Sequence, residues 1–127
     1  MNSDPYLREL TGEIVDAGLK VHRALGPGLL ESAYEHCLAF ELSSRGLDVE
    51  RQVAMPIVYR GVRMDAVYRL DLVVRKEVIV EVKAVEAISP LHEAQLLTYL
   101  RLSDLLIGYL LNFNVKLFKD GVRRLRS

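Results

Sequence analysis

Three charged side chains interrupt the two most strand-like runs of the sequence. Residues 69–74 contain Asp71, and residues 78–84 contain Glu81 and Lys83, at positions where a structural strand prefers apolar side chains. Because burying an unpaired carboxylate is costly, such groups are usually paired with cations or bind a metal ion. These two runs are therefore the first place to look for chemistry.

The pairing register decides whether the two carboxylates can act together. A three-residue hairpin loop at residues 75–77 predicts that Asp71 lies directly opposite Glu81. The same register places Arg69 opposite Lys83. All apolar side chains of the hairpin would then share one face and all charged ones the other. A two-residue loop would instead separate the carboxylates, because a shift of one residue reverses the faces of a strand.

Carboxylates on opposing strands repel each other, and a divalent cation relieves that repulsion. Mg²⁺ prefers oxygen ligands, typically one or two carboxylates together with waters and substrate phosphate oxygens. Lys83, two residues beyond Glu81, lies on the same face, where its ammonium can act on a water molecule or stabilise phosphate charge. The same spacing also permits a metal-free cluster of salt bridges, formed by the two carboxylates with Arg69 and Lys83.

Hydrophobic periodicity predicts the elements that must position these residues. Apolar side chains recur three and four residues apart from Pro5 to Leu25, which predicts a first helix. Alternation with a period of two begins at Val49 and indicates strands. The predicted helices span about 5–25, 29–45 and 90–102, and the predicted strands span about 49–59, 62–74, 78–84 and 105–111.

Local signals support two of the remaining boundaries. Ser89-Pro90 is typical of an N-cap followed by proline at the first helical position. Asp120-Gly121, between residues 117–118 and Val122, predicts a tight closing hairpin. The predicted order is α-α-β-β-β-α-β-β-β, without repeats or linkers, so we expect one domain over residues 1–127.

Composition restricts the class of protein. Of the 127 residues, 50% are hydrophobic and 27% charged, which is typical of a globular chain. The single cysteine, Cys37, excludes a disulfide framework or a cysteine-based zinc site within one chain. No apolar stretch reaches the roughly 18 residues of a membrane span. We expect a cytoplasmic protein that does not engage a membrane.

The net charge of zero is a cancellation between two unlike halves. Residues 1–50 hold four basic and nine acidic residues, a net charge of −5, and residues 51–127 hold 13 basic and eight acidic residues, a net charge of +5. Such an asymmetry can produce a basic face that the total conceals. Neutrality therefore does not exclude a nucleic-acid partner, although solvated strand faces would give the same count.

The order of these residues resembles the PD-(D/E)XK nuclease superfamily. Asp71 precedes Glu81-Val82-Lys83 on an apolar strand, and Gln95 and Tyr99 follow on the next helix. Within that superfamily, Gly28-Leu-Leu-Glu31-Ser-Ala-Tyr34 resembles the signature of the GxxExxY proteins. The segments 21–22, 25–27, 92–99 and 111–114 fit the same family, and the likeness extends from about residue 10 to 125. Leu70 stands where the superfamily name has proline.

The resemblance implies a fold and a metal site. The fold is α/β (α+β), a restriction-endonuclease-like α-β-β-β-α-β core with an extra N-terminal helix and a C-terminal β-hairpin, its mixed sheet flanked by helices. Asp71 and Glu81 would be ligands of Mg²⁺ or Mn²⁺, with the carbonyl of Val82 as a third. Lys83 would serve the attacking water. Glu31 would reach the metal directly or through water, although a negative charge in the first turn of a helix is favourable in itself.

Other positions are implied as supporting residues. Gln95 and Tyr99 would brace the site or touch the phosphate backbone, and the alternative is a solvated helix face. Tyr34, one turn after Glu31, either holds that carboxylate or packs in the core. His22 is a candidate supporting residue, but a lone helix histidine is more often structural.

The function implied by the resemblance is metal-dependent hydrolysis of phosphodiester bonds in nucleic acid, with DNA as the expected substrate. The alternative is a non-catalytic nucleic-acid-binding or scaffold protein that retains the nuclease fold. At 127 residues the chain is too small to carry a separate DNA-reading domain, so we expect a homodimer or a larger protein partner to contribute to substrate binding.

Overall fold

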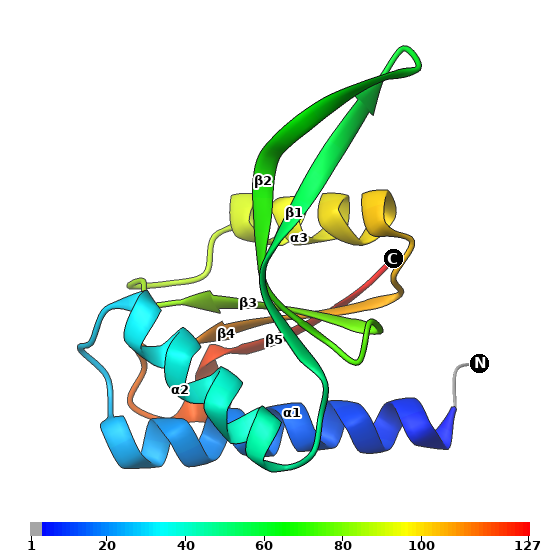
Figure 1. The fold of residues 1–127 in the computed structure, drawn as a ribbon. Coiled ribbons are helices and arrows are strands. Elements are labelled where there is room, and N and C mark those ends of the chain that lie inside the picture. Colours follow the sequence, from blue (N-terminus) through cyan, green and yellow to red (C-terminus); the bar gives the residue numbers. More distant parts are fainter. Residues whose placement is uncertain (1–3) are drawn as a thin grey trace.

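The structure, a computed structural model, describes residues 4–127, except for the side chains of residues 66 and 67. Within this range the strands form one mixed five-stranded sheet in the order β1-β2-β3-β4-β5. Only β3 and β4 pair in parallel, and α3 makes the crossover between them (Figure 1). The elements are α1 (Pro5–Leu25), α2 (Glu31–Ser44), β1 (Val49–Tyr59), β2 (Val62–Val74), β3 (Val78–Lys83), α3 (Pro90–Ser103), β4 (Ile107–Asn112), the 3₁₀ helix η1 (Phe118–Gly121) and β5 (Val122–Arg126).

The first helix has the bounds that the periodicity predicts. Asp4 caps it by accepting hydrogen bonds from the backbone N–H groups of Tyr6 and Leu7, and Pro5 occupies its first turn. Gly26 ends it with a φ of 69°, in the left-handed region that favours glycine. The second helix starts at Glu31, two residues later than predicted, so Glu31 lies at its N-terminus.

The sheet is covered on both faces, which corrects the prediction that the hairpin is apolar on one side only. One face carries Val78, Val80 and Val82 and packs against α1 and α2. The other face carries Val73 and Ile79 and packs against α3. Leu70, expected to share a face with Leu72 and Val74, belongs to the α3 side. Strands buried on both faces are apolar at consecutive positions, and a period-two pattern does not capture this. The core residues on the α3 side are Met55, Leu70, Val73, Ile79, Leu96, Leu100 and Leu110.

Strands β1 and β2 continue beyond the sheet as a two-stranded ribbon. Their pairing runs from Val49↔Val74 to Tyr59↔Val62, whereas β2 pairs with β3 only over residues 72–74. The ribbon therefore projects away from the body, next to α3 (Figure 1). The β2–β3 pairing ends at Leu72↔Val80, so the prediction that Arg69 pairs with Lys83 is wrong, and on the other edge of β2 Arg69 pairs with Ala54 of β1. β1 and β3 lie on opposite edges of β2, and the β1–β2 pairing continues where β3 diverges.

The C-terminal hairpin joins β4 to β5, and the strand predicted at residues 117–118 is not formed: Phe118 begins η1. Asp120 and Gly121 belong to η1 instead of a two-residue turn, and β5 pairs antiparallel with β4. The Asp-Gly dipeptide favours a turn only locally, and here packing against β4 decides the backbone conformation. Gly121 lies so close to β4 that a Cβ atom there would collide with the carbonyl oxygen of Asn112. None of the described helices is both long and apolar enough to span a lipid bilayer.

We predict that Gly121→Ala destabilises the protein by about 1–3 kcal/mol, because the added methyl group must displace backbone at Asn112. Thermal unfolding followed by circular dichroism measures the effect. Gly12→Ala is the matched control: Gly12 is exposed within α1 with open space around it, so alanine is expected to stabilise that helix by up to about 1 kcal/mol. Equal midpoints for the two variants would contradict the assigned close approach.

Candidate active site where β2 and β3 separate

The two carboxylates lie at the point where β2 leaves β3. The predicted three-residue loop is confirmed by the Val74↔Val78 pair, and the ladder ends two residues further on, at Leu72↔Val80. Beyond that pair, side-chain carboxylates take the place of backbone carbonyl oxygens as hydrogen-bond acceptors. The Asp71 N–H donates to Glu81 Oε2 at 2.9 Å, and the Val82 N–H donates to Asp71 Oδ2 at 2.8 Å. Each carboxylate is thereby fixed by the opposite strand.

The positive charge around Asp71 and Glu81 is too small to balance the negative charge of two ionised carboxyl groups. The Glu81 side chain is buried, with 7% exposed, and burial together with the charge of Asp71 raises its pKa to about 8. Burial also raises the pKa of Asp71, and the charges of Glu35 and Glu31 add to that effect. The positive charge of Lys83 opposes both shifts. The arrangement is electrostatically costly without a further cation.

Glu31 joins the site from α2. Its Oε2 accepts a hydrogen bond from the Ala84 N–H at 3.2 Å, directly after Lys83 at the end of β3. A carboxylate at a helix N-terminus is also favoured by the helix dipole. The side chain is therefore held at the carboxyl end of the central strand.

Tyr34 packs in the core, and its hydroxyl hydrogen-bonds to backbone groups instead of to Glu31. Its hydroxyl donates to the Gly26 carbonyl at 2.6 Å and accepts from the Leu29 N–H at 3.0 Å. Its ring stacks on Phe113 with a centroid separation of 4.6 Å. Tyr34 thus fixes the loop from which Glu31 emerges.

Glu35 is a member of the acidic cluster that the sequence interpretation missed. It is buried, accepts hydrogen bonds from Gln52 Nε2 at 2.9 and 3.1 Å, and pairs with Arg51 at 3.2 Å. Its spacing of four residues from Glu31 places both on one helix face, and that spacing could have revealed it.

The α3 residues lie beside the carboxylates. Burial raises the pKa of Tyr99, and the charge of Glu81 raises it further, so the phenol lies within electrostatic reach of the acidic pair. Gln95, one turn earlier, is exposed and borders an adjoining pocket. The helix begins as predicted at Ser89, whose side chain and that of His92 form a reciprocal cap.

His22 lies in the core instead of the acidic cluster. It is buried, its Nε2 is 2.7 Å from the Val115 carbonyl oxygen, and its ring lies against Phe113 and Phe118. These contacts correspond to the structural interpretation of a lone helix histidine.

A buried asparagine anchors the segment after β3. Asn112 accepts from the N–H groups of Val85 and Asn114 and donates to the Val85 carbonyl. Lys83 and Asn112 are paired positions on parallel strands. Asn112 thereby fixes the backbone that leaves Lys83.

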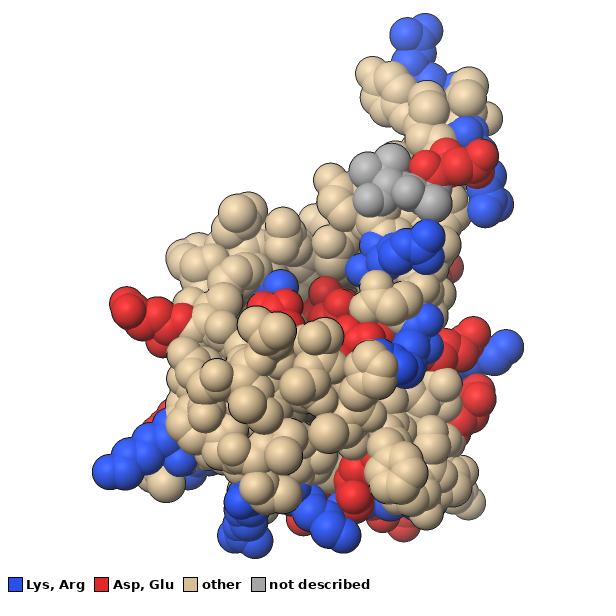
Figure 2. Space-filling view, turned by 60° about the vertical axis from the view of Figure 1, so that its left-hand side comes forward, with Lys and Arg blue, Asp and Glu red and all other residues tan. Residues whose placement is uncertain are grey.

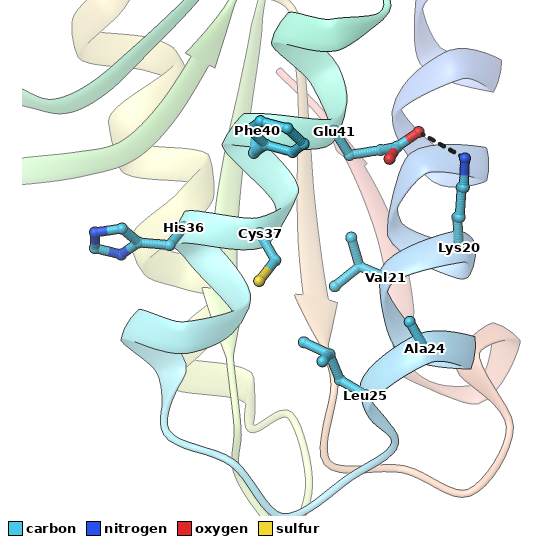
Figure 3. A pocket seen from close by; sticks show the side chains of 8 residues that line it. All are labelled: Lys20, Val21, Ala24, Leu25, His36, Cys37, Phe40 and Glu41. Atoms are coloured by element: carbon cyan, nitrogen blue, oxygen red, sulfur yellow. Dashed lines mark ion pairs between the residues drawn. The ribbon is translucent and has the colours of Figure 1, made fainter.

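Acidic side chains gather in a hollow between the body and the ribbon, with basic side chains bordering it (Figure 2). A second pocket, between α1 and α2, is mostly apolar and is lined by residues outside the acidic cluster (Figure 3). It includes Cys37, which is partly buried against the core, and the ion pair between Lys20 and Glu41 at 3.6 Å crosses its edge.

The donor set fits a hard divalent cation with few protein ligands. Among residues 4–127 no group of three or more His, Cys, Asp or Glu side chains is arranged to hold a metal ion. Mg²⁺ needs only one or two carboxylates, because it retains several waters. Asp71 Oδ1 and Glu81 Oε1 are not used by the two backbone hydrogen bonds, and a cation between them would relieve the repulsion.

The α-β-β-β-α-β order, the mixed sheet and the acidic pair followed by lysine define a restriction-endonuclease-like protein. The chain matches the family model of the PD-(D/E)XK nuclease superfamily over residues 8–125, and it belongs to that superfamily. No curated protein and no solved structure matches the chain significantly.

We predict that, without metal, the protein loses stability as pH rises from about 4.5 to about 8. The unfolded Glu81 carboxyl releases its proton near 4.5, whereas the folded one keeps it to about 8. Over that range the folded state binds more protons, so the free energy of unfolding falls with pH. Chemical denaturation in EDTA at several pH values measures the slope.

Glu81→Gln should flatten this slope while keeping an acceptor oxygen for the Asp71 N–H. Glu9→Gln, on an exposed position of α1, is the control and should retain the wild-type slope. A slope that Glu81→Gln leaves unchanged would show that the acidic pair is not the source.

Proposed function

We propose that this protein is a nuclease that hydrolyses phosphodiester bonds in DNA with Mg²⁺ or Mn²⁺. The observation that carries the proposal is the buried pair of Asp71 and Glu81, fixed by backbone hydrogen bonds on diverging strands, with Lys83 on the same strand. Membership of a nuclease superfamily supports it. Within that superfamily, the Gly28–Tyr34 segment supports assignment to the GxxExxY proteins.

Asp71 and Glu81 would hold the metal through their available oxygens, with the Val82 carbonyl as a third ligand. Glu31, whose Oε2 is engaged by the Ala84 N–H, would contribute through water. A bound divalent cation polarises a phosphoryl oxygen and activates water for in-line attack.

The residues around the metal would orient the reactants. The ammonium of Lys83 would hold the attacking water and stabilise negative charge on the phosphate. Gln95 and Tyr99 on α3 would face the substrate strand from the opposite side. Tyr34 and Asn112 would act indirectly, by fixing the segments that carry Glu31 and follow Lys83.

The ribbon supports a nucleic-acid substrate. Arg60, Arg63 and Arg69 are exposed on it, and Figure 2 shows basic side chains along the ribbon and at the border of the acidic hollow. With a total charge of zero, affinity for DNA would be modest and sensitive to salt. A homodimer or a larger protein partner would raise the affinity for DNA. We also propose that the protein is cytoplasmic.

Cleavage assays test the proposal. Linear, nicked, branched and single-stranded DNA, and RNA, are incubated with Mg²⁺ or Mn²⁺. We predict that Asp71→Asn and Lys83→Met each lower the cleavage rate roughly 100-fold or more, because the first removes a charge that holds the metal and the second removes a cation beside the reacting phosphate. Lys116→Met, an exposed lysine outside the site, should cleave like wild type.

Activity that persists in both site variants would place the chemistry elsewhere. Cleavage of RNA alone would overturn the choice of DNA. No cleavage of any substrate, together with no metal binding, would favour the scaffold function.

Metal binding can be tested without activity. At a metal concentration 100 times the dissociation constant, Mg²⁺ or Mn²⁺ should stabilise the folded protein by about 2.7 kcal/mol, or roughly 10 °C in Tm. Differential scanning fluorimetry measures the shift. The shift should be lost in Asp71→Asn/Glu81→Gln and retained in Glu9→Gln; an equal shift in all three proteins would rule out this site.

A further inference from the structure

A pocket of about 320 Å³ lies between the ribbon and α3. Its volume is at the lower end of the range of about 300–1,000 Å³ found for small-ligand sites. Ile57 and Tyr68 line it from the ribbon, and the α3 side chains Leu91, Ala94, Gln95, Thr98, Tyr99 and Leu102 line it from the helix.

The walls combine flat aromatic surface with free polar groups. The rings of Tyr68 and Tyr99 lie 5.9 Å apart at an angle of 51°, and Tyr68 is 42% exposed. Within residues 4–127, no hydrogen-bond partner engages the Gln95 amide or the hydroxyls of Tyr68, Thr98 and Tyr99. A ring with polar edges could stack on the aromatic wall and satisfy these groups.

The pocket adjoins the acidic pair. Tyr99 lines it from α3, the helix that packs on the sheet face that carries Ile79. Tyr99 also packs against the core that contains Ile79, two residues before Glu81 on the same strand face. Anything bound in the pocket would therefore sit near a phosphate that a metal ion at Asp71 and Glu81 would bind.

We propose that this pocket binds one unpaired nucleobase of the DNA strand being cleaved, next to the scissile phosphate. The proposal rests on the proposed nuclease function and specifies its substrate class: DNA with at least one unpaired nucleotide at the site. A base within a duplex is stacked and paired on both sides, so only an unpaired or extruded base can enter such a pocket.

The features of the pocket favour a base over a purely apolar occupant. Its polar groups include a carboxamide and three hydroxyls, which can pair with the edge of a base. The exposed arginines of the adjoining ribbon provide counter-charges for the phosphates on either side. A purely apolar ligand would leave the polar groups of the pocket without hydrogen-bond partners and the arginines without phosphates to bind.

The test measures binding in Asp71→Asn/Glu81→Gln, a background in which neither cleavage nor carboxylate repulsion contributes. Three fluorescent probes are compared by anisotropy: a single strand, an abasic strand of equal length and charge, and a fully paired duplex. We expect the single strand to bind at least about 5-fold more tightly than the abasic strand. Adding Tyr68→Ala should remove this difference, and Tyr68→Phe should retain it.

Two further variants test the preference for bases without relying on Tyr68→Ala alone. Ala94→Phe would fill the pocket from α3 and should also remove the preference for bases. Tyr59→Ala lies on the same ribbon, where Tyr59 is 63% exposed and outside the pocket lining, and should retain it. Thermal unfolding of each variant confirms that the proteins compared are folded.

Equal binding of the single and abasic strands, or equal weakening of both by Tyr68→Ala, would overturn the pocket assignment. Wild-type cleavage of paired and unpaired DNA at equal rates, unaffected by Tyr68→Ala, would overturn it while leaving the nuclease function intact. Base-dependent binding without cleavage in Mg²⁺ or Mn²⁺ would support the pocket and overturn the nuclease function.

Discussion

The site depends on one exchange of hydrogen bonds, at the point where β2 stops pairing with β3. Backbone acceptors are replaced there by the carboxylates of Asp71 and Glu81, which bind the N–H groups of Val82 and Asp71. The exchange keeps two strands together without a ladder, and it frees β2 to follow β1 into the ribbon. It also places two acidic groups together in a mostly buried place, where ionising both is costly. The strands hold the two carboxyl groups in fixed positions. The electrostatic cost of ionising both groups favours the binding of a cation.

The surrounding elements bring further groups to the same point from different directions. Glu31 arrives at the N-terminus of α2 and bonds to the backbone just beyond Lys83, while Tyr99 arrives from α3 on the other side of the sheet. Tyr34 and Asn112 hold the connecting segments by hydrogen bonds to backbone. The site is therefore assembled on strand and helix ends whose positions are set by two separate cores.

The charge distribution agrees with this arrangement. The zero net charge conceals acidic N-terminal helices and a basic second half. In the folded chain, acidic side chains occupy the hollow and basic ones border it and continue along the ribbon (Figure 2). A cation bound in the hollow would reduce the repulsion that a phosphate would otherwise meet there, and the ribbon arginines would act on neighbouring phosphates.

Sequence alone determined the order of the helices and of β1 to β4, the register of the β2–β3 hairpin and the meeting of Asp71 with Glu81, because periodicity and a short loop are local properties. It could not determine where the hairpin ends, so it paired Arg69 with Lys83; that outcome depends on how far β2 follows β1, on its other edge, away from β3. It also missed Glu35, whose partners lie on β1, and it mistook Asp120-Gly121 for a turn. Packing between segments far apart in the chain placed His22 in the core and opened the pocket between the ribbon and α3. These features depend on tertiary contacts, which no local pattern of residue types records.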